Sequence, residues 1–131
     1  MIDVVAIETD IKNALSGITF VSVEAHRIRE VIPITQMPAL DISSSGHTMK
    51  RDAQRHYTVP VVLVIRNKGV DREDNAIQFK RFIFDICVIL ESLRTANIDI
   101  VSDITSNNAE GDTGDGGFVR ASVISINVLK N

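Results

Sequence analysis

Apolar residues recur at helical spacing in two segments of the chain, and this pattern predicts two α-helices. The first segment covers about residues 3–16, and Gly17 follows it at a position where glycine commonly ends a helix. The second segment covers about residues 72–94. Each apolar stripe needs another layer of structure to cover it. The apolar positions are Val4, Ile7, Ile11, Ala14 and Leu15 in the first segment, and Ala76, Phe79, Ile83, Ile86, Leu90 and Leu93 in the second.

The second segment carries charges suited to the two ends of a helix. Asp71 is placed to cap its start, and Arg94 suits the negative end of the helix dipole. Phe82 and Ile89 widen the apolar stripe beyond what one face of a sheet needs. We expect this excess to contact the first helix, and contact with another subunit is the alternative.

Five further segments have the alternation or the apolar content of β-strands. The strongest covers about residues 54–66, with five alternate apolar residues on one face and Val62 and Val64 on the other. This predicts a central strand, in which Pro60 must lie at a bulge or face no ladder partner. The other four segments cover about residues 18–30, 39–42, 98–104 and 118–129.

Polar residues dominate two segments next to these strands, residues 43–52 and 106–117. The second is acidic, rich in glycine and without a large apolar residue, so it cannot contribute to a core. We expect both segments to be exposed loops that order against neighbouring molecules. In the strand after the second loop, the apolar face changes from odd to even positions, which predicts a bulge or burial on both sides.

The predicted order of elements is α-β-β-β-α-β-β. A chain of 131 residues, 44% of them hydrophobic, suits one domain with an adequate core. We therefore predict a single two-layer α+β domain over residues 1–131, with a mostly antiparallel sheet of about five strands and both helices on one face. The single cysteine, Cys87, lies in an apolar run, and we expect it to be buried.

Charge is distributed unevenly along the chain, although the formal net charge is only −3. Residues 47–82 carry eight basic and four acidic groups, whereas the segments on either side are acidic. Faces of opposite sign suit head-to-tail association between copies, and ordinary solvated charge is the open alternative. A sequence pI near 5.5 argues against a module that grips DNA, which would display a dominant basic stripe.

Catalytic and metal-binding motifs receive little support from the sequence. Asp112-Thr113-Gly114 matches the active-site triplet of aspartic proteases, but it lies in a polar glycine-rich segment rather than between apolar strands. The same segment lacks the glycine and glutamate positions of an EF-hand. His26, His47 and His56 have no ligand spacing, and one cysteine is too few for a standard zinc site. We predict a protein without enzymatic activity, cofactor or metal.

Three stretches give the chain a resemblance to a known family. They are Met37 to Ile42, with its Pro-Ala-apolar pattern, the long strand from Arg55 to Ile65, and the closing region from Ile104 to Val128. Together with chain length and the first helix, they resemble the lambda-type tail-terminator and minor tail proteins of long-tailed bacteriophages. The resemblance covers nearly the whole chain.

That resemblance implies a structural virion protein of the phage neck, present in the host cytoplasm during assembly. Six copies would form a ring on the last ring of tail-tube subunits, stop tube polymerisation and present a face to the head-tail connector protein. DNA would pass through the lumen without sequence-specific binding, and no membrane would be involved. Acidic residues near the amino terminus and the absence of a membrane-spanning apolar stretch agree with synthesis in the cytosol.

The two polar segments, with Arg55 at the start of the following strand, supply the candidate contact residues of such a ring. Lys50, Arg51 and Arg55 would attract carboxylates on a tube or connector rim. Asp112 and Asp115 would pair with basic groups of a neighbouring molecule, or would repel DNA so that it does not adhere to the wall of the channel. Two alternatives remain at this point: a head-completion or stopper protein of the same neck, and an unrelated cytosolic binding module or small hydrolase.

Overall fold

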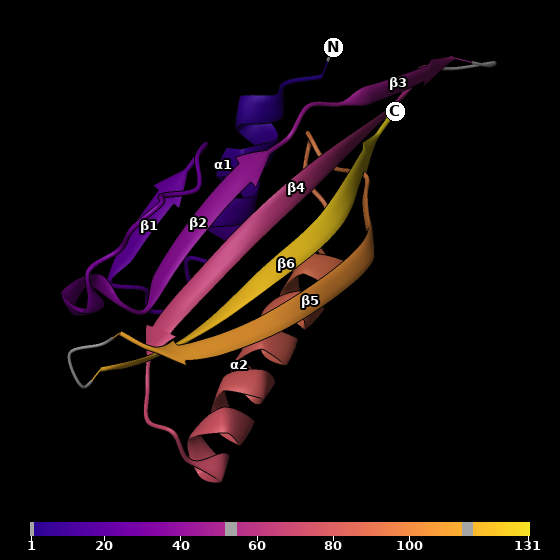
Figure 1. Cartoon of the computed structure of the whole chain (residues 1–131). Helices are drawn as coiled ribbons and strands as arrows, with labels where there is room; N and C mark the ends of the chain where they lie inside the picture. The colour runs from indigo at the N-terminus through magenta and orange to yellow at the C-terminus, as the bar shows by residue number, and fades with distance from the viewer. Residues whose placement is uncertain (1, 52–54, 114–116) are drawn as a thin grey trace.

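Two α-helices and six β-strands form the part of the chain that the computed structural model describes, which is residues 2–51, 55–113 and 117–131 (Figure 1). Their order confirms the predicted α+β domain, with one strand more than expected. The elements are α1 (Val4–Ala14), β1 (Ser22–Ala25), a 3₁₀ turn (Ile34–Gln36), β2 (Ala39–Ser44), β3 (Thr48–Arg51), β4 (Arg55–Lys68), α2 (Glu73–Glu91), β5 (Ile100–Asp112) and β6 (Phe118–Lys130).

The strands form one sheet in the order β1-β2-β4-β6-β5, and β3 pairs with the start of β4. Every pair is antiparallel except β1 and β2. Parallel neighbours need a long connection, and residues 26–38 provide it. In this connection Ile32 and Met37 pack on Ala39, so it covers part of the sheet face that carries Ala39. We call this the outer face.

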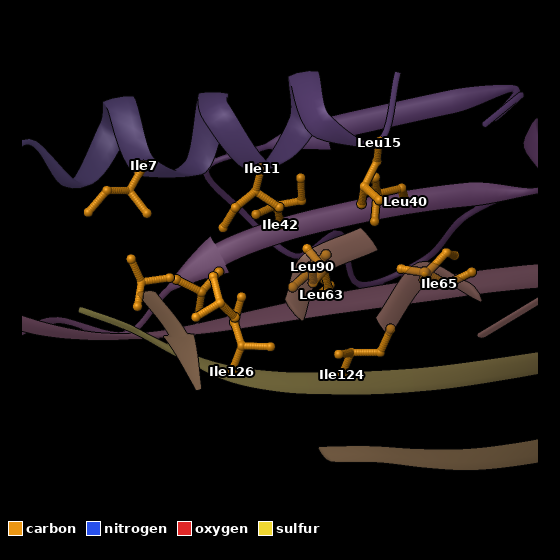
Figure 2. Packing of buried hydrophobic residues seen from close by; sticks show 14 of the residues in the cluster. Ile7, Ile11, Leu15, Leu40, Ile42, Leu63, Ile65, Leu90, Ile124 and Ile126 are labelled. Atoms are coloured by element: carbon orange, nitrogen blue, oxygen red, sulfur yellow. The ribbon is translucent and has the colours of Figure 1, made fainter. Parts of the chain in front are cut away.

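Both helices lie on the opposite, inner face of the sheet, as predicted (Figure 1). Figure 2 shows Ile7 and Ile11 of α1, and Leu15 directly after it, over Leu40 and Ile42 of β2, while α2 contributes Leu90 to the same cluster. Burying each such side chain stabilises the fold by about 1.5–3 kcal/mol. Asp3 caps the start of α1, because its carboxylate accepts a hydrogen bond from the Ala6 N–H at 3.0 Å.

The residues that widen the apolar stripe of α2 pack against the core, and the aromatic partner of Phe82 is Phe20, which lies outside α1. Phe82 and Ile89 are half-buried against the core, and the Phe82 ring lies 6.1 Å from that of Phe20. α1 and α2 contact each other directly. Cys87 is only half-buried, whereas full burial was predicted. Its helical position turns it toward the flank of α2 that faces β5.

The predicted ends of the second helix are wrong. Arg72, not Asp71, occupies the position before the first turn, and its side chain makes no capping hydrogen bond. The Asn75 side chain instead accepts a hydrogen bond from the Val70 N–H at 3.2 Å, which fixes the approach to the helix. The helix ends at Glu91, so Arg94 lies beyond its last turn.

β4 occupies the centre of the sheet. Pro60 lies opposite Asn127 of β6 in the register, so it has a ladder partner on that side, but it has none in β2 or β3 on the other side. The Pro60 carbonyl accepts a hydrogen bond from the Ser45 N–H, so the backbone of Pro60 points away from β6. On that side β2 pairs with β4 only from Val61 onward and β3 only up to Thr58. The missing N–H of proline therefore removes no strand pairing.

Candidate functional site

Lys50 and Arg51 lie in β3, a short strand that the sequence did not reveal. β3 forms a hairpin with the start of β4, in which Lys50 faces His56 and Arg51 faces Arg55. All four residues of β3 are exposed. The backbone of Arg55 belongs to this hairpin, and its side chain lies outside the described part of the structure. We call residues 48–51 and 55–58 the basic hairpin.

Asp112 is the last residue of β5, where it faces Phe118 of β6. Asp112 is exposed, as is Glu110 two residues before it. Asp115 lies outside the described residues. We call residues 110–113 and 117–120 the acidic hairpin.

The prediction of two loops, at residues 43–52 and 106–117, is therefore wrong for most of their length. Ser43 and Ser44 extend β2, residues 48–51 form β3, and residues 106–112 continue β5 along β6. The last of these segments is exposed throughout, so its predicted absence from the core is confirmed. Backbone pairing with β6, which needs no apolar side chains, makes it a strand.

The two charged hairpins lie at opposite ends of the sheet (Figure 1). At one end β3 pairs with residues 55–58 of β4, and Tyr57 of β4 faces Lys130 of β6. At the other end Lys68 of β4 faces Val119, and the acidic hairpin continues past this pair. The structure thus brings Lys50 and Arg51 together and separates them from Asp112 by the length of the sheet.

A buried ion-pair cluster on the outer face was missed by the sequence reasoning. Asp41 of β2 is fully buried, and its carboxylate accepts a hydrogen bond from Arg29 Nε at 2.6 Å. Arg66 of β4 lies 3.4 Å from the other carboxylate oxygen and also donates to the Arg29 carbonyl at 2.9 Å. These contacts fasten the connection between β1 and β2 to the sheet.

Arg120 of β6 forms a second unpredicted cluster at the acidic hairpin. Its guanidinium is buried and donates to Asn75 Oδ1 at 2.7 Å, to the Val70 carbonyl at 3.0 Å and to the Glu110 carboxylate. Arg120 therefore ties this hairpin to the start of α2. Because its donors are used within the fold, Arg120 has a structural role rather than a ligand-binding one.

The prediction of a bulge or of burial on both sides in the last strand is wrong. β6 has no bulge against β4, and its even-numbered residues face inward along its length. The apparent change of apolar face arises because two inward positions are polar, Arg120 and Ser122. The bulge lies in β5, between Ser102 and Thr105.

Among the residues that the structure describes, two ionisable groups have shifted pKa values. Burial raises the pKa of the Cys87 thiol, which keeps it protonated and unreactive near neutral pH. The Asn131 N–H donates to the Asp99 carboxylate at 2.7 Å and lowers the pKa of that group, an effect that Lys130 reinforces and partial burial opposes. Neither shift lies at the charged hairpins.

The described residues contain no group of three histidine, cysteine or acidic side chains arranged to hold a metal ion. No helix among them is long and apolar enough to cross a bilayer. No protein-family model matches the chain, and no curated protein matches it. Inference about its role therefore depends on its surfaces.

Replacing Asp112 by Asn tests whether that carboxylate does chemistry. Asp112 is exposed, and the residue opposite it across the ladder is Phe118 rather than a second aspartate of an active-site pair. We expect the variant to keep any assembly function within a modest factor. The check is peptide hydrolysis by the wild type and the variant, and wild-type cleavage that disappears in Asp112→Asn would contradict the prediction.

Proposed function

We propose that this chain is a non-enzymatic structural subunit of a phage neck, which assembles as a ring at the head-proximal end of the tail tube. The ring ends tube polymerisation and offers the surface on which the head connector joins. It belongs to the virion and is built in the host cytoplasm. Six copies follow from the resemblance to lambda-type tail terminators, and DNA passes through the lumen without sequence-specific contacts.

The observation that carries this proposal is the placement of the two charged hairpins at opposite ends of one rigid sheet. A ring subunit between a tube and a connector needs two different axial surfaces. The exposed Lys50 and Arg51 supply a positive surface at one end, and the exposed Asp112 supplies a negative group at the other, where the Glu110 carboxylate is already paired with Arg120. Complementary charge speeds encounter and fixes orientation more than it adds affinity, which suits a subunit that must dock in one direction.

Cryo-electron microscopy of tail tubes mixed with the protein tests this role. We expect one ring, at one end of each tube, and no further growth of the tube beyond it. Tubes that elongate past the protein, or that do not bind it, would contradict the terminator function. Rings that plug DNA-filled heads but leave tubes uncapped would favour the stopper position in the neck.

A further inference from the structure

A groove runs between α2 and β5 at one lateral edge of the molecule. One part of it has a volume of about 490 Å³ and is lined by Phe84, Cys87, Val88 and Ile104. Phe84 is 67% exposed and Val88 is 47% exposed, although both belong to the helix that covers the core. This flank of α2 is apolar and uncovered, whereas Phe82 and Ile89 pack against the core.

β5 lies beside this groove at the edge of the sheet. At alternate residues of β5, the backbone N–H and C=O groups point away from the sheet. Thr113 N–H donates to the Gly117 carbonyl, which sets the phase of the antiparallel ladder between β5 and β6. Residues 107, 109 and 111 consequently point their backbone groups at β6. Ser106, Asn108 and Glu110 point theirs away from the sheet, where a further strand could pair.

The opposite lateral edge has matching features. β1 is the edge strand there, and α1 lies beneath β1 and β2. Val21, just before β1, and Val5 of α1 are each 58% exposed. Each lateral edge therefore offers a free strand in the sheet layer and exposed apolar side chains in or near the helix layer.

Strand direction makes these two edges suitable for pairing with each other. β1 runs parallel to β2, and the three remaining pairings along the sheet are antiparallel, so β1 runs antiparallel to β5. A second copy that is rotated about an axis along the strands would place its β1 antiparallel to β5 of the first. Antiparallel pairing of two strands is slightly more stable per residue than parallel pairing. α1 of the second copy would then approach α2 of the first, so both layers would continue across the junction.

Charge is consistent with the same contact. Glu91 and Asp103 are the charged residues among those lining this part of the α2–β5 groove. On the other edge, Lys12 is the charged residue among those lining a hollow between α1 and β1. Opposite charges at these two hollows favour contact between different edges over contact of an edge with its own copy, and the Glu24–Arg27 ion pair on the β1 edge adds no net charge.

We propose that the α2–β5 groove is a strand-addition site, and that its occupant is the β1 edge of a second copy of this chain. The contact is head-to-tail, so repeated use builds the ring. The identification of the occupant as another copy rests on the proposed function. The strand polarity and the exposed apolar flank are independent of it.

Crosslinking between the two edges tests the contact directly. In a Cys87→Ser background, Glu24→Cys places a thiol on β1 and Thr105→Cys places one on β5, both on the outer face of the sheet. We expect a short bismaleimide to join a mixture of the two single variants into a covalent dimer, and to join the double variant into a ladder of multimers. Each single variant alone should remain uncrosslinked, because a head-to-tail contact never brings like edges together.

The outcome separates this inference from the proposed function when the same samples are also mixed with tail tubes. Rings that cap tubes without a crosslink between positions 24 and 105 would overturn the edge pairing and leave the tube role intact. Dimers of Thr105→Cys alone would overturn it in favour of a two-fold contact between β5 strands. Crosslinked multimers that do not cap tubes would support the edge pairing and contradict the tube role.

A proline in β5 tests the backbone hydrogen bonds of the same junction. Asn108→Pro removes an N–H that points away from β6, so the fold should melt close to the wild-type temperature. Self-association, measured by sedimentation, should weaken by about tenfold or more. The variant loses one backbone hydrogen bond to the added strand, and the pyrrolidine ring of proline hinders the approach of that strand. Asn108→Ala, which keeps the N–H, should associate as the wild type does. Equal association of the Pro and Ala variants would overturn strand addition.

Discussion

Replacing Asp41 by Ala should lower the free energy of unfolding by about 3–5 kcal/mol, the loss typical when one partner of a buried ion pair is removed. Asp41 is fully buried, and both arginines facing it have less than a fifth of their side chains exposed. Without the carboxylate, Arg29 and Arg66 would face each other as uncompensated charges. Urea denaturation of the wild type and the variant measures the difference.

A matched control is Asp74→Ala, which removes an exposed aspartate paired with Arg72 at 3.1 Å. Exposed pairs contribute about 0.2–1 kcal/mol, so this variant should unfold close to the wild type. A similar loss of stability in the two variants would contradict the importance of burial at Asp41. The proposed edge pairing would also depend on the buried ion-pair cluster around Asp41, because the cluster holds the connection that leads from the β1 edge back to β2.

The spacing of apolar residues was sufficient to predict the helices and strands that bury one face. Both helices and the central strand β4 show regular apolar spacing because each packs against the core along its length. The rule fails where a strand buries neither face. In β3 and the distal half of β5, every described side chain is exposed, so no alternation marks the strand. Backbone pairing with a distant segment decides the structure there.

The buried charges could not be assigned from sequence for a related reason. Asp41 meets Arg29 and Arg66 only after the sheet has formed, since these residues come from separate elements. Arg120 likewise needs Asn75 of α2 beside it. A usable signal existed in each case, namely a charged residue at an interior position of an otherwise apolar strand. Such a residue requires a buried partner, because an unpaired charge is strongly disfavoured there.

For the candidate interfaces, the sequence predicted which charges are exposed but not where they lie. Lys50, Arg51 and Asp112 were expected on the surface, and they are exposed. Their separation to opposite ends follows from strand register, which no local pattern encodes. The lateral groove was missed, because the predicted apolar stripe of the second helix and its widening by Phe82 and Ile89 did not include Phe84 and Val88.

Reversing the charge of the basic hairpin, with Lys50→Glu and Arg51→Glu, should abolish most tube capping while leaving the fold intact. Both side chains are exposed, so thermal melting should remain close to that of the wild type. Each subunit of the ring would then present like charge to a surface that attracts the native hairpin. Such contacts cost several kcal/mol, so capping should weaken by at least about tenfold at low salt. The difference should shrink as salt screens the charges.

Lys80 and Arg81 of α2 provide the control, since both are exposed and Lys80 lies beside the acidic hairpin, at the opposite end of the sheet from the basic hairpin. Lys80→Glu with Arg81→Glu changes the net charge by the same amount and should leave capping nearly unchanged. Tube capping by electron microscopy and melting temperature should be measured on the same preparations. If the variant at positions 50 and 51 caps tubes normally at low salt, or if both double variants lose capping equally, the basic hairpin is not an axial contact.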